Sequence, residues 1–390
     1  MKILQIIPSI SLIYGGPSQM LLGLAPALAR AGTKVTILTT NSNGDTGQKP
    51  LDVPLNCPIQ QDGYEIIYFH CAPFRRYKFS LSLLTWLKNH IHEFEVAHIH
   101  ALFSPISSAA AIVCRQYNLP YILRPLGTLD PADLRKKRQL KCLYAAILER
   151  YNLAGAAAIH FTSEQEAKVS ERFGVSTRDL VIPLGVIPPV SYEGEIRKKF
   201  NIPSHKPLII FMSRIDQKKG LNLLIAALEK LLLDNYEFHF VLAGSNPQDP
   251  TYEQRIKLQI ENSPLRSHTT MTGFVSGELK ASLLQAADLF VLPSYYENFG
   301  IAVAEAMVAG VPVLISDQVY ISPQVQESES GWVGKNNVKV LVELLKTALS
   351  DPQERQRRGL NAKKYALEHY SWDAIARQIV QVYQEILDTN

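Results

Sequence analysis

The sequence has no apolar run long enough to cross a bilayer, because every hydrophobic stretch falls short of the roughly 18 residues that a membrane-spanning helix needs. Its few cysteines, Cys57, Cys71, Cys114 and Cys142, are scattered, without C-x-x-C spacing or histidines at zinc-ligand intervals, so we expect reduced thiols rather than disulfides or a zinc site. A net charge of +4 over 390 residues lacks the concentrated basic surface that nucleic-acid binding requires. These absences favour a soluble globular protein.

Two motifs that handle phosphate groups are also missing. No D-x-D triplet occurs, so the usual metal clamp on a nucleotide diphosphate is lacking, and we expect neither a metal ion nor another cofactor. No G-x-G-x-x-G follows the first predicted strand, which argues against an NAD-dependent dehydrogenase. The N-terminal MKILQIIPSI lacks the longer apolar region and cleavage site of a signal peptide, so it predicts a first β-strand and a cytoplasmic protein.

Short runs rich in β-branched residues alternate with longer stretches of helical period, which indicates parallel sheets with crossover helices. A chain of this length exceeds one ordinary core, so two domains are expected. The proline-rich connector after VIPLGVIPPV places their boundary at 187/188. We therefore predict an α/β fold with Rossmann-like domains over 1–187 and 188–370, and an amphipathic C-terminal helix over 371–390.

The segment ENFGIAVAE places two carboxylates around a turn that follows the predicted strand LFVLPS. Gly300 is expected to open a helix whose first free N–H groups, near Asn298 to Ile301, can hold a phosphate. Glu297 precedes this helix and Glu305 lies in its second turn, where carboxylates can accept hydrogen bonds from sugar hydroxyls. The structural alternative is that Glu305 is a salt-bridged core residue and Glu297 a solvated loop charge.

Another predicted strand ends in FMSRIDQKKG and brings Arg214 and Lys219 to its carboxyl end, where ligands of open α/β sheets bind. Two cations at this position can neutralise a leaving diphosphate, although an ordinary basic loop is the structural alternative. Gly15 and Gly16, between the first strand and the first helix, leave room for a phosphate to approach the backbone, or form a plain turn.

Two further features carry open alternatives. Strand alternation puts His98 and His100 on one face, and at least one of them is expected to be structural. The basic stretch 132–150, DLRKKRQLKCLYAAILER from Asp133, predicts a helix with a cationic face that is either solvated or meets anionic lipid headgroups or a phosphate-linked acceptor. Its five basic residues before Leu143 are Arg135, Lys136, Lys137, Arg138 and Lys141.

With these residues in view, the chain resembles the retaining glycosyltransferases of family 4, which have two facing Rossmann-like domains, the GT-B fold. The segments that carry the resemblance are GGPSQMLLGLAPALARAGTKVTILTT, SRIDQKKG, LAGSNP, TGFVSGELKASLLQAADLFVLPSYYENFGIAVAEAMVAGVPVL and YSWDAIARQI. The resemblance implies an acceptor-binding N-terminal domain, a C-terminal domain that binds a nucleotide sugar, and a last helix that crosses back to the N-terminal domain.

The resemblance also implies roles for individual residues. Glu297 would contact donor-sugar hydroxyls, Glu305 would hold the ribose, and Arg214 with Lys219 would grip the diphosphate. The other residues expected at the nucleotide sugar are Gly15, Gly16, Gly127, Thr128, Ser213, Gly244, Phe274, Val275, Asn298, Phe299, Gly300 and Ile301.

One departure from the family pattern concerns the group beside the anomeric carbon. Many relatives carry a histidine after the fifth strand, where this chain reads ILRPLGTLDP. His100, Thr128 or a backbone carbonyl are the candidates for that position, and His100 is the catalytic side chain we expect among them. The RPLGTLDP segment and its basic helix resemble bacterial exopolysaccharide and cell-envelope enzymes that act on lipid-linked acceptors.

The function implied is retaining transfer of a hexose, with glucose from UDP-glucose as the first expectation, to a saccharide or lipid-linked saccharide acceptor. The location implied is the cytoplasm, with the inner face of the membrane as one option. A nucleotide-sugar epimerase, or a non-catalytic protein that binds nucleotide sugars, is the alternative.

Overall fold

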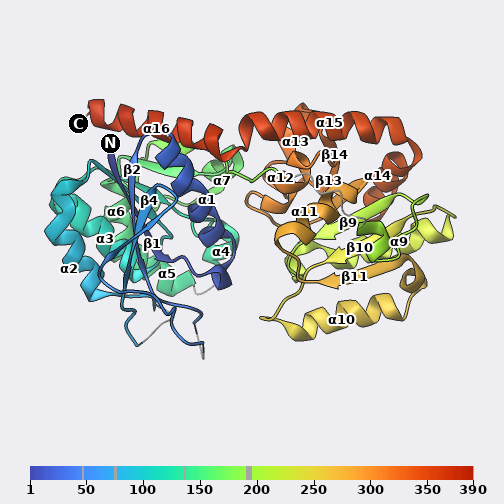
Figure 1. Ribbon diagram of the computed structural model, residues 1–390, viewed down its shortest axis with the longest axis horizontal. Helices are drawn as coiled ribbons and strands as arrows, with labels where there is room; N and C mark the ends of the chain where they lie inside the picture. Colours follow the sequence, from blue (N-terminus) through green and yellow to red (C-terminus); the bar gives the residue numbers. More distant parts are fainter. Residues whose placement is uncertain (46–47, 74–76, 136–137, 190–195, 390) are drawn as a thin grey trace. The chain divides into compact units, whose positions relative to one another are not determined.

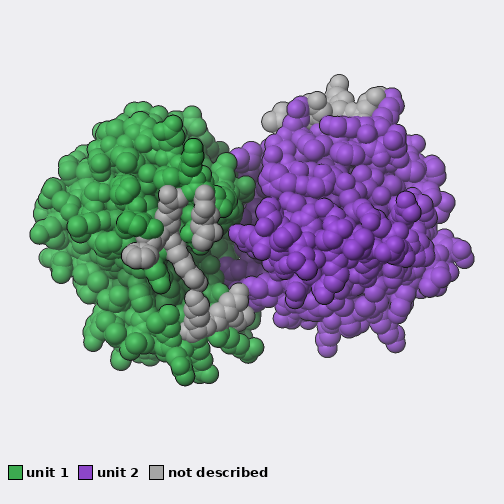
Figure 2. All heavy atoms as spheres, turned by 90° about the horizontal axis from the view of Figure 1, so that it is seen from below, with its two compact units in different colours: residues 1–185, 372–390 green, residues 186–371 purple. Residues whose placement is uncertain are grey.

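The computed structural model describes residues 1–45, 48–73, 77–135, 138–189 and 196–389. The chain forms two compact units, one of Met1–Gly185 with Trp372–Asn390 and one of Val186–Ser371 (Figure 2). The unit boundaries therefore fall at 185 and 371, where 187 and 370 were expected. Each unit is an α/β domain with its own largely parallel sheet, so the predicted fold class is confirmed.

The first unit is built on an eight-stranded sheet in the order β3-β4-β2-β1-β5-β6-β7-β8. Its neighbours pair in parallel except β3, which runs antiparallel to β4. The sequence pattern missed β3 because PIQQ is largely exposed and shows no alternation of apolar residues. The strands are β1 Lys2–Ser9, β2 Lys34–Thr40, β3 Pro58–Gln61, β4 Tyr64–Phe69, β5 Val96–His100, β6 Tyr121–Arg124, β7 Ala158–Phe161 and β8 Asp179–Val181.

Helices cover both faces of this sheet (Figure 1). One apolar core joins the sheet to α1 and to the C-terminal α16, which lie side by side. The other core joins the opposite face to α2, α3 and α6. The helices are η1 Leu12–Tyr14, α1 Gly16–Arg30, α2 Leu81–His90, η3 Ile91–Glu93, α3 Pro105–Gln116, α4 Pro131–Leu134, α5 Arg138–Tyr144, a π-helical turn Ala145–Glu149, α6 Arg150–Ala154, α7 Glu164–Val169 and α16 Trp372–Thr389.

The second unit has a six-stranded parallel sheet in the order β11-β10-β9-β12-β13-β14. Its edge strand β14 was not expected because GWVG begins and ends with glycine. A Cβ at Gly331 would collide with the carbonyl oxygen of Val313, so glycine permits this pairing. The strands are β9 Leu208–Met212, β10 His239–Ala243, β11 Thr269–Gly273, β12 Leu289–Leu292, β13 Val313–Ser316 and β14 Gly331–Gly334.

Side-chain caps fix where several helices of this unit begin. Asp249, Asn337 and Asp351 each accept a hydrogen bond from a backbone N–H in the first turn of α10, α14 and α15. The helices are α8 Ile196–Lys199, η5 Gln217–Lys219, α9 Leu221–Leu233, α10 Pro250–Glu261, η6 Pro264–His268, α11 Gly277–Ala286, α12 Ile301–Val308, α13 Ser322–Glu327, α14 Val338–Ser350 and α15 Pro352–His369.

Candidate functional site

The N-terminus of α12 lies at the carboxyl edge of the second sheet, after β12. Gly300 is its N-cap and adopts φ 79°, a left-handed conformation that favours glycine. The first intrahelical hydrogen bonds run from the N–H of Val303 and Ala304 to the Gly300 carbonyl, so the N–H groups of Ile301 and Ala302 in the first turn have no intrahelical acceptor. Gly300 therefore opens α12 as expected, and phosphate binding at Asn298 to Ile301 stays a prediction.

Glu297 and Lys219 form an ion pair at this edge. Glu297 follows β12 and Lys219 follows β9, and these two strands are neighbours in the sheet. Only 19% of the Glu297 side chain and 16% of the Lys219 side chain are exposed. Glu297 is therefore held against a cation, and the alternative of a solvated loop charge is wrong.

The backbone around Glu297 is fixed by a third loop. Its N–H donates to the Gln318 carbonyl at 3.1 Å, and its carbonyl accepts from the N–H of Tyr320 at 3.0 Å. Gln318 and Tyr320 follow β13, so loops after three adjacent strands hold this residue. Such support positions a functional side chain more rigidly than a single loop does.

Two of the predicted site positions, Gly244 and Ser213, pack against each other at the same edge of the sheet. A Cβ at Gly244, after β10, would collide with the carbonyl oxygen of Ser213, after β9. In the same way, Gly220, at the start of α9, lies against the carbonyl oxygen of Pro293. These glycines let neighbouring strand ends approach closely, which brings their loops together.

Arg214 has a different partner from Lys219 and Glu297. Its side chain is exposed and its Nη1 donates to the Gln248 Oε1 at 3.2 Å. Arg214 is thus a cation at the carboxyl edge of β9 that carries no ion pair among the described residues.

Glu305 forms an ion pair with Lys280, a partner that the sequence did not identify. Its Oε1 accepts a hydrogen bond from Lys280 Nζ at 2.6 Å, and Lys280 belongs to α11. The signal was present, because a carboxylate amid the apolar residues of α12 requires a partner, and TGFVSGELK supplies a cation nearby in the fold. The structure thus contains the salt bridge of the structural alternative, and the ribose contact stays a prediction.

The residues expected beside the base and the sugar lie in different environments. Phe274, after β11, is 74% exposed, whereas Val275 is buried. The Phe299 ring is buried and packs edge-on against Tyr370 with ring centroids 5.3 Å apart, so only its backbone is available to a ligand. Phe274 is therefore the one large aromatic surface among these positions.

In the first unit, the predicted Gly15 and Gly127 occupy turns with positive φ, which glycine adopts without strain. Gly15 adopts φ 70° as the N-cap of α1, and Gly127 adopts φ 78° after β6. The Gly127 N–H donates to the buried carboxylate of Glu166 at 3.1 Å, and Thr128 Oγ1 donates to the Pro125 carbonyl at 2.8 Å. Glu166, which the sequence analysis missed, therefore holds the loop that contains Gly127 and Thr128.

His100 does not lie where a substrate can reach it. The residue is 0% exposed, and its Nε2 bonds to Gln5 Oε1 at 2.8 Å. His98 stacks on it at 4.7 Å, which confirms that both histidines share one face. Burial holds the pKa of each ring well below its usual value. The catalytic assignment of His100 is therefore corrected to a structural one.

The basic stretch is not the single helix 132–150 that was expected. It contains the short α4, then α5, a π-helical turn and α6, and residues Lys136 and Lys137 lie outside the described residues. Pro131 begins α4, as a proline does at a first helical position. Lys141 Nζ forms an ion pair with the Asp133 carboxylate at 2.6 Å, so its charge is paired within the protein.

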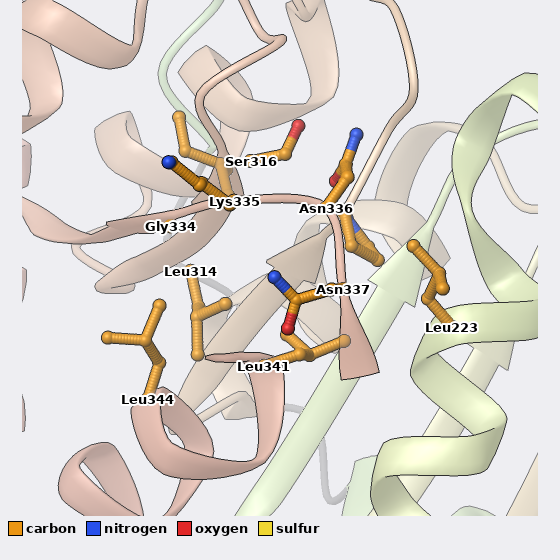
Figure 3. A pocket seen from close by; sticks show the side chains of 11 residues that line it. Leu223, Leu314, Ser316, Gly334, Lys335, Asn336, Asn337, Leu341 and Leu344 are labelled. Carbon is orange, nitrogen blue, oxygen red and sulfur yellow. The ribbon is translucent and has the colours of Figure 1, made fainter. Parts of the chain in front are cut away.

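A small hollow lies at the carboxyl ends of β13 and β14 (Figure 3). Ser316, Asn336 and Leu341 are among its lining residues, and its volume of about 10 Å³ is room for about one water molecule. A nucleotide sugar is far larger, so this hollow is not a donor site. Within the described residues, no three His, Cys, Asp or Glu side chains are grouped to bind a metal ion, and no helix is long and apolar enough to span a membrane.

Comparisons with known proteins agree on one family. Residues 193–365 match the family described as Glycosyl transferases group 1, and residues 15–185 match the Glycosyl transferase 4-like domain. An uncharacterized glycosyltransferase of Methanocaldococcus jannaschii is 33% identical over 198 residues, which are 50% of each chain. The chain thus spans about half the length of that relative. The D-inositol 3-phosphate glycosyltransferase of Xylanimonas cellulosilytica is 25% identical over 95% of this chain and 92% of that protein.

Solved structures show the same fold. Sucrose-phosphate synthase from Thermosynechococcus elongatus superimposes with a TM-score of 0.79 over all of both chains, at 22% identity. Anabaena HepE in complex with UDP and glucose gives a TM-score of 0.75 at 18% identity, over 99% of this chain and 100% of that one. Family matches over both units and this shared fold together show that the chain belongs to the glycosyltransferases of the group 4 type, with the GT-B fold.

Proposed function

We propose that this protein transfers a hexose from a nucleotide sugar to an acceptor hydroxyl, with retention of configuration and without a metal ion. The observation that carries the proposal is the cluster at the carboxyl edge of the second sheet. There the Lys219–Glu297 pair, the exposed cation of Arg214 and the N-terminus of α12 all follow β9 or β12. Cations and helix N–H groups suit a diphosphate, and the carboxylates suit sugar hydroxyls.

The proposed chemistry needs little from the protein beyond position and charge. The bond between the sugar and the diphosphate opens, the acceptor hydroxyl attacks the same face, and a diphosphate oxygen takes its proton. Negative charge grows on the leaving diphosphate, so Lys219 and Arg214 act most strongly in the transition state. Glu297 holds Lys219 in the absence of donor and contacts donor-sugar hydroxyls when donor is bound.

Glu305 is proposed to hold the ribose, with Lys280 as the positioning residue that orients its carboxylate. Phe274 offers its exposed ring beside the base. The donor proposed first is UDP-glucose, because HepE, which shares the fold, has been solved with UDP-glucose. The acceptor proposed is a saccharide or a lipid-linked saccharide in the assembly of a bacterial exopolysaccharide or cell-envelope polymer.

A thermal-shift panel of UDP, GDP, ADP and their glucose conjugates tests the donor. A ligand at 100 times its Kd stabilises the protein by about 2.7 kcal/mol, so the true donor and its nucleoside diphosphate raise Tm, whereas nucleotides with another base do not. The panel is run with EDTA and again with Mg²⁺, and a shift that needs Mg²⁺ refutes the metal-free proposal. No shift with any nucleotide sugar refutes the function.

Product analysis separates transfer from the alternatives. An epimerase converts the donor sugar without an acceptor, and a binding protein leaves it unchanged. We expect slow hydrolysis of the donor alone and an α-linked product from an α-linked donor once an acceptor is supplied. An inverted anomer contradicts retention.

A further inference from the structure

The stretch Arg138–Ala154 contains α5, the π-helical turn and α6 (Figure 1), and it buries two polar residues, Glu149 and Asn152. Glu149 is 1% exposed, and its carboxylate accepts from the N–H of Phe103 at 2.9 Å and from Ser108 Oγ at 2.6 Å. Asn152 is fully buried and donates to the same carboxylate at 3.2 Å. A carboxylate and an amide therefore occupy the inner face together with the apolar Ala145 and Leu153.

Large apolar residues occupy the outer face of the same stretch. Leu140 is 62% exposed, Leu143 59%, Ile147 59% and Tyr151 60%. Their spacing of three, four and four residues places them along one side of the helix, and we call these four residues the apolar stripe. Surface helices of soluble proteins bury their large apolar residues, whereas here four of them are exposed on the outer face. An exposed apolar row of this kind marks an interaction surface.

The charges beside the apolar stripe have one sign. Arg138 and Arg150 are exposed in the same stretch, as is Arg135 just before it. In the sequence from Leu134 to Ala154 the one acidic residue is Glu149, and it is buried. A second copy of the chain in a twofold dimer would set these cations against each other, whereas an anionic surface complements them.

We infer that the apolar stripe docks the protein on an anionic bilayer, with its four apolar side chains in the headgroup and acyl boundary and Arg138 and Arg150 at lipid phosphates. A helix with an apolar face flanked by arginines lies in the membrane interface in this way. The inference deepens the proposed function, because a bilayer is where a lipid-linked acceptor is held. Docking itself needs neither donor nor acceptor, so it is tested without them.

Co-sedimentation of the full chain with vesicles tests the docking. The wild-type protein is expected to bind vesicles of phosphatidylglycerol and phosphatidylcholine, and Leu143→Glu/Ile147→Glu to bind at least about tenfold more weakly. Leu233→Glu is the matched control, because Leu233 lies in α9 and is 78% exposed. This control is expected to bind like the wild type. Equal binding of the double variant overturns the inference.

The charge contribution is tested with Arg138→Gln/Arg150→Gln. Each arginine contributes about fivefold on anionic vesicles, so this pair is expected to lose about 25-fold there and little on pure phosphatidylcholine. Wild-type protein that does not bind anionic vesicles overturns the inference. Light scattering tests the alternative that a second copy of the chain covers the apolar stripe. If the wild-type protein is a dimer and Leu143→Glu/Ile147→Glu is a monomer, the apolar stripe is a contact between copies and the inference is overturned. Donor hydrolysis by these variants is expected at the wild-type rate, so a failure of docking is separate from a failure of the proposed reaction.

Discussion

Lys219 and Glu297 are mostly shielded from solvent, and a partly buried ion pair of this kind contributes little to stability by itself. Their value lies in geometry, because each side chain fixes the other at the point where a leaving diphosphate is proposed. Lys219→Ala is expected to reduce kcat by about 30- to 1,000-fold, about 2 to 4 kcal/mol, with a smaller change in KM. Steady-state kinetics with the donor measures both.

The control for this variant is its neighbour Lys218→Ala. The Lys218 ammonium lies 5.9 Å from the centre of the Tyr296 ring and is in no ion pair among the described residues. We expect its kcat to stay within about twofold of the wild type, since surface substitutions are usually mild. A Lys219→Ala enzyme with unchanged kcat would remove Lys219 from the proposed mechanism.

Glu305 gives a prediction about the ribose. Glu305 is proposed to accept a hydrogen bond from one ribose hydroxyl. The wild-type protein is therefore expected to bind UDP about 10- to 150-fold more tightly than an analogue that lacks this hydroxyl, because a hydrogen bond to a charged group has this strength. Glu305→Gln should lose most of this preference, and Lys280→Met should weaken it by releasing the carboxylate. Calorimetry with UDP and its 2′-deoxy and 3′-deoxy analogues measures the difference. Unchanged discrimination in Glu305→Gln places the ribose elsewhere.

Three buried histidines of the first unit, His98, His100 and His160, predict a loss of stability in acid. Gln5 donates to Tyr383, whose hydroxyl bonds to His98, and His98 bonds to His160, whose other nitrogen donates to the Ile182 carbonyl. Burial first, and the Arg124 charge second for His98 and His160, hold the pKa of these rings well below 6.5. The hydrogen-bonded chain thus suits neutral rings.

Because the folded pKa values are lowered, the stabilisation is present above the unfolded pKa of about 6.5 and is lost as pH falls below it. Each histidine contributes a slope of up to about 1.4 kcal/mol per pH unit, so all three contribute about 4 kcal/mol per unit. Urea unfolding between pH 7.5 and pH 5 should show this fall. His160→Gln should lower the slope by up to about 1.4 kcal/mol per pH unit, and an unchanged slope would mean that His160 does not titrate on unfolding.

At the scale of elements, the turn into α12 decides whether Glu297 and the helix N–H groups meet. Gly300→Ala forces a Cβ into a left-handed position and places it 3.3 Å from Glu297 Cγ and 3.2 Å from Val303 Cγ2. We expect a loss of about 1–2 kcal/mol of stability from the backbone. Displacement of Glu297 should cost a further loss of activity, up to about 100-fold.

Gly174→Ala is the matched control for the turn. Gly174 has φ 76° and no atom within 4 Å of an added Cβ, so it carries the same backbone strain without the contacts. Its stability should fall by about 1–2 kcal/mol while kcat stays unchanged. Equal kcat in both variants would show that the turn geometry at Gly300 is not needed for activity.

At the scale of the whole molecule, the last helix completes the core of the first unit. Ile375, Ile379 and Ile386 of α16 are buried with residues of α1 and the sheet. Ile379→Ala is expected to cost about 2–5 kcal/mol, because it removes buried methyl groups from a core that the first 185 residues cannot close alone. Val380→Ala, at a partly buried position, should cost less than about 1.5 kcal/mol. Urea denaturation measures both, and a small cost at Ile379 would contradict this role of α16.

The sequence by itself determined the α/β class, most of the strands, the glycine turn into α12 and the amphipathic last helix. These features follow from local patterns, since β-branched runs, helical periodicity and glycine or proline positions act within a few residues of the chain. Gly300 begins α12 as predicted, because its left-handed φ depends on the residue itself and its immediate turn. The edge strands β3 and β14 lacked such a local signal.

Only the tertiary structure decided which side chains meet. Lys219 reaches Glu297 because β9 and β12 are neighbours, and Lys280 reaches Glu305 because α11 lies beside α12's second turn. His100 is structural because Gln5 and the helices over its face bury it, and the apolar stripe is exposed because Glu149 and Asn152 hold the other face inward. Pairing and burial depend on strand order and on which face of an element is covered, and neither feature can be derived from a local pattern of residues.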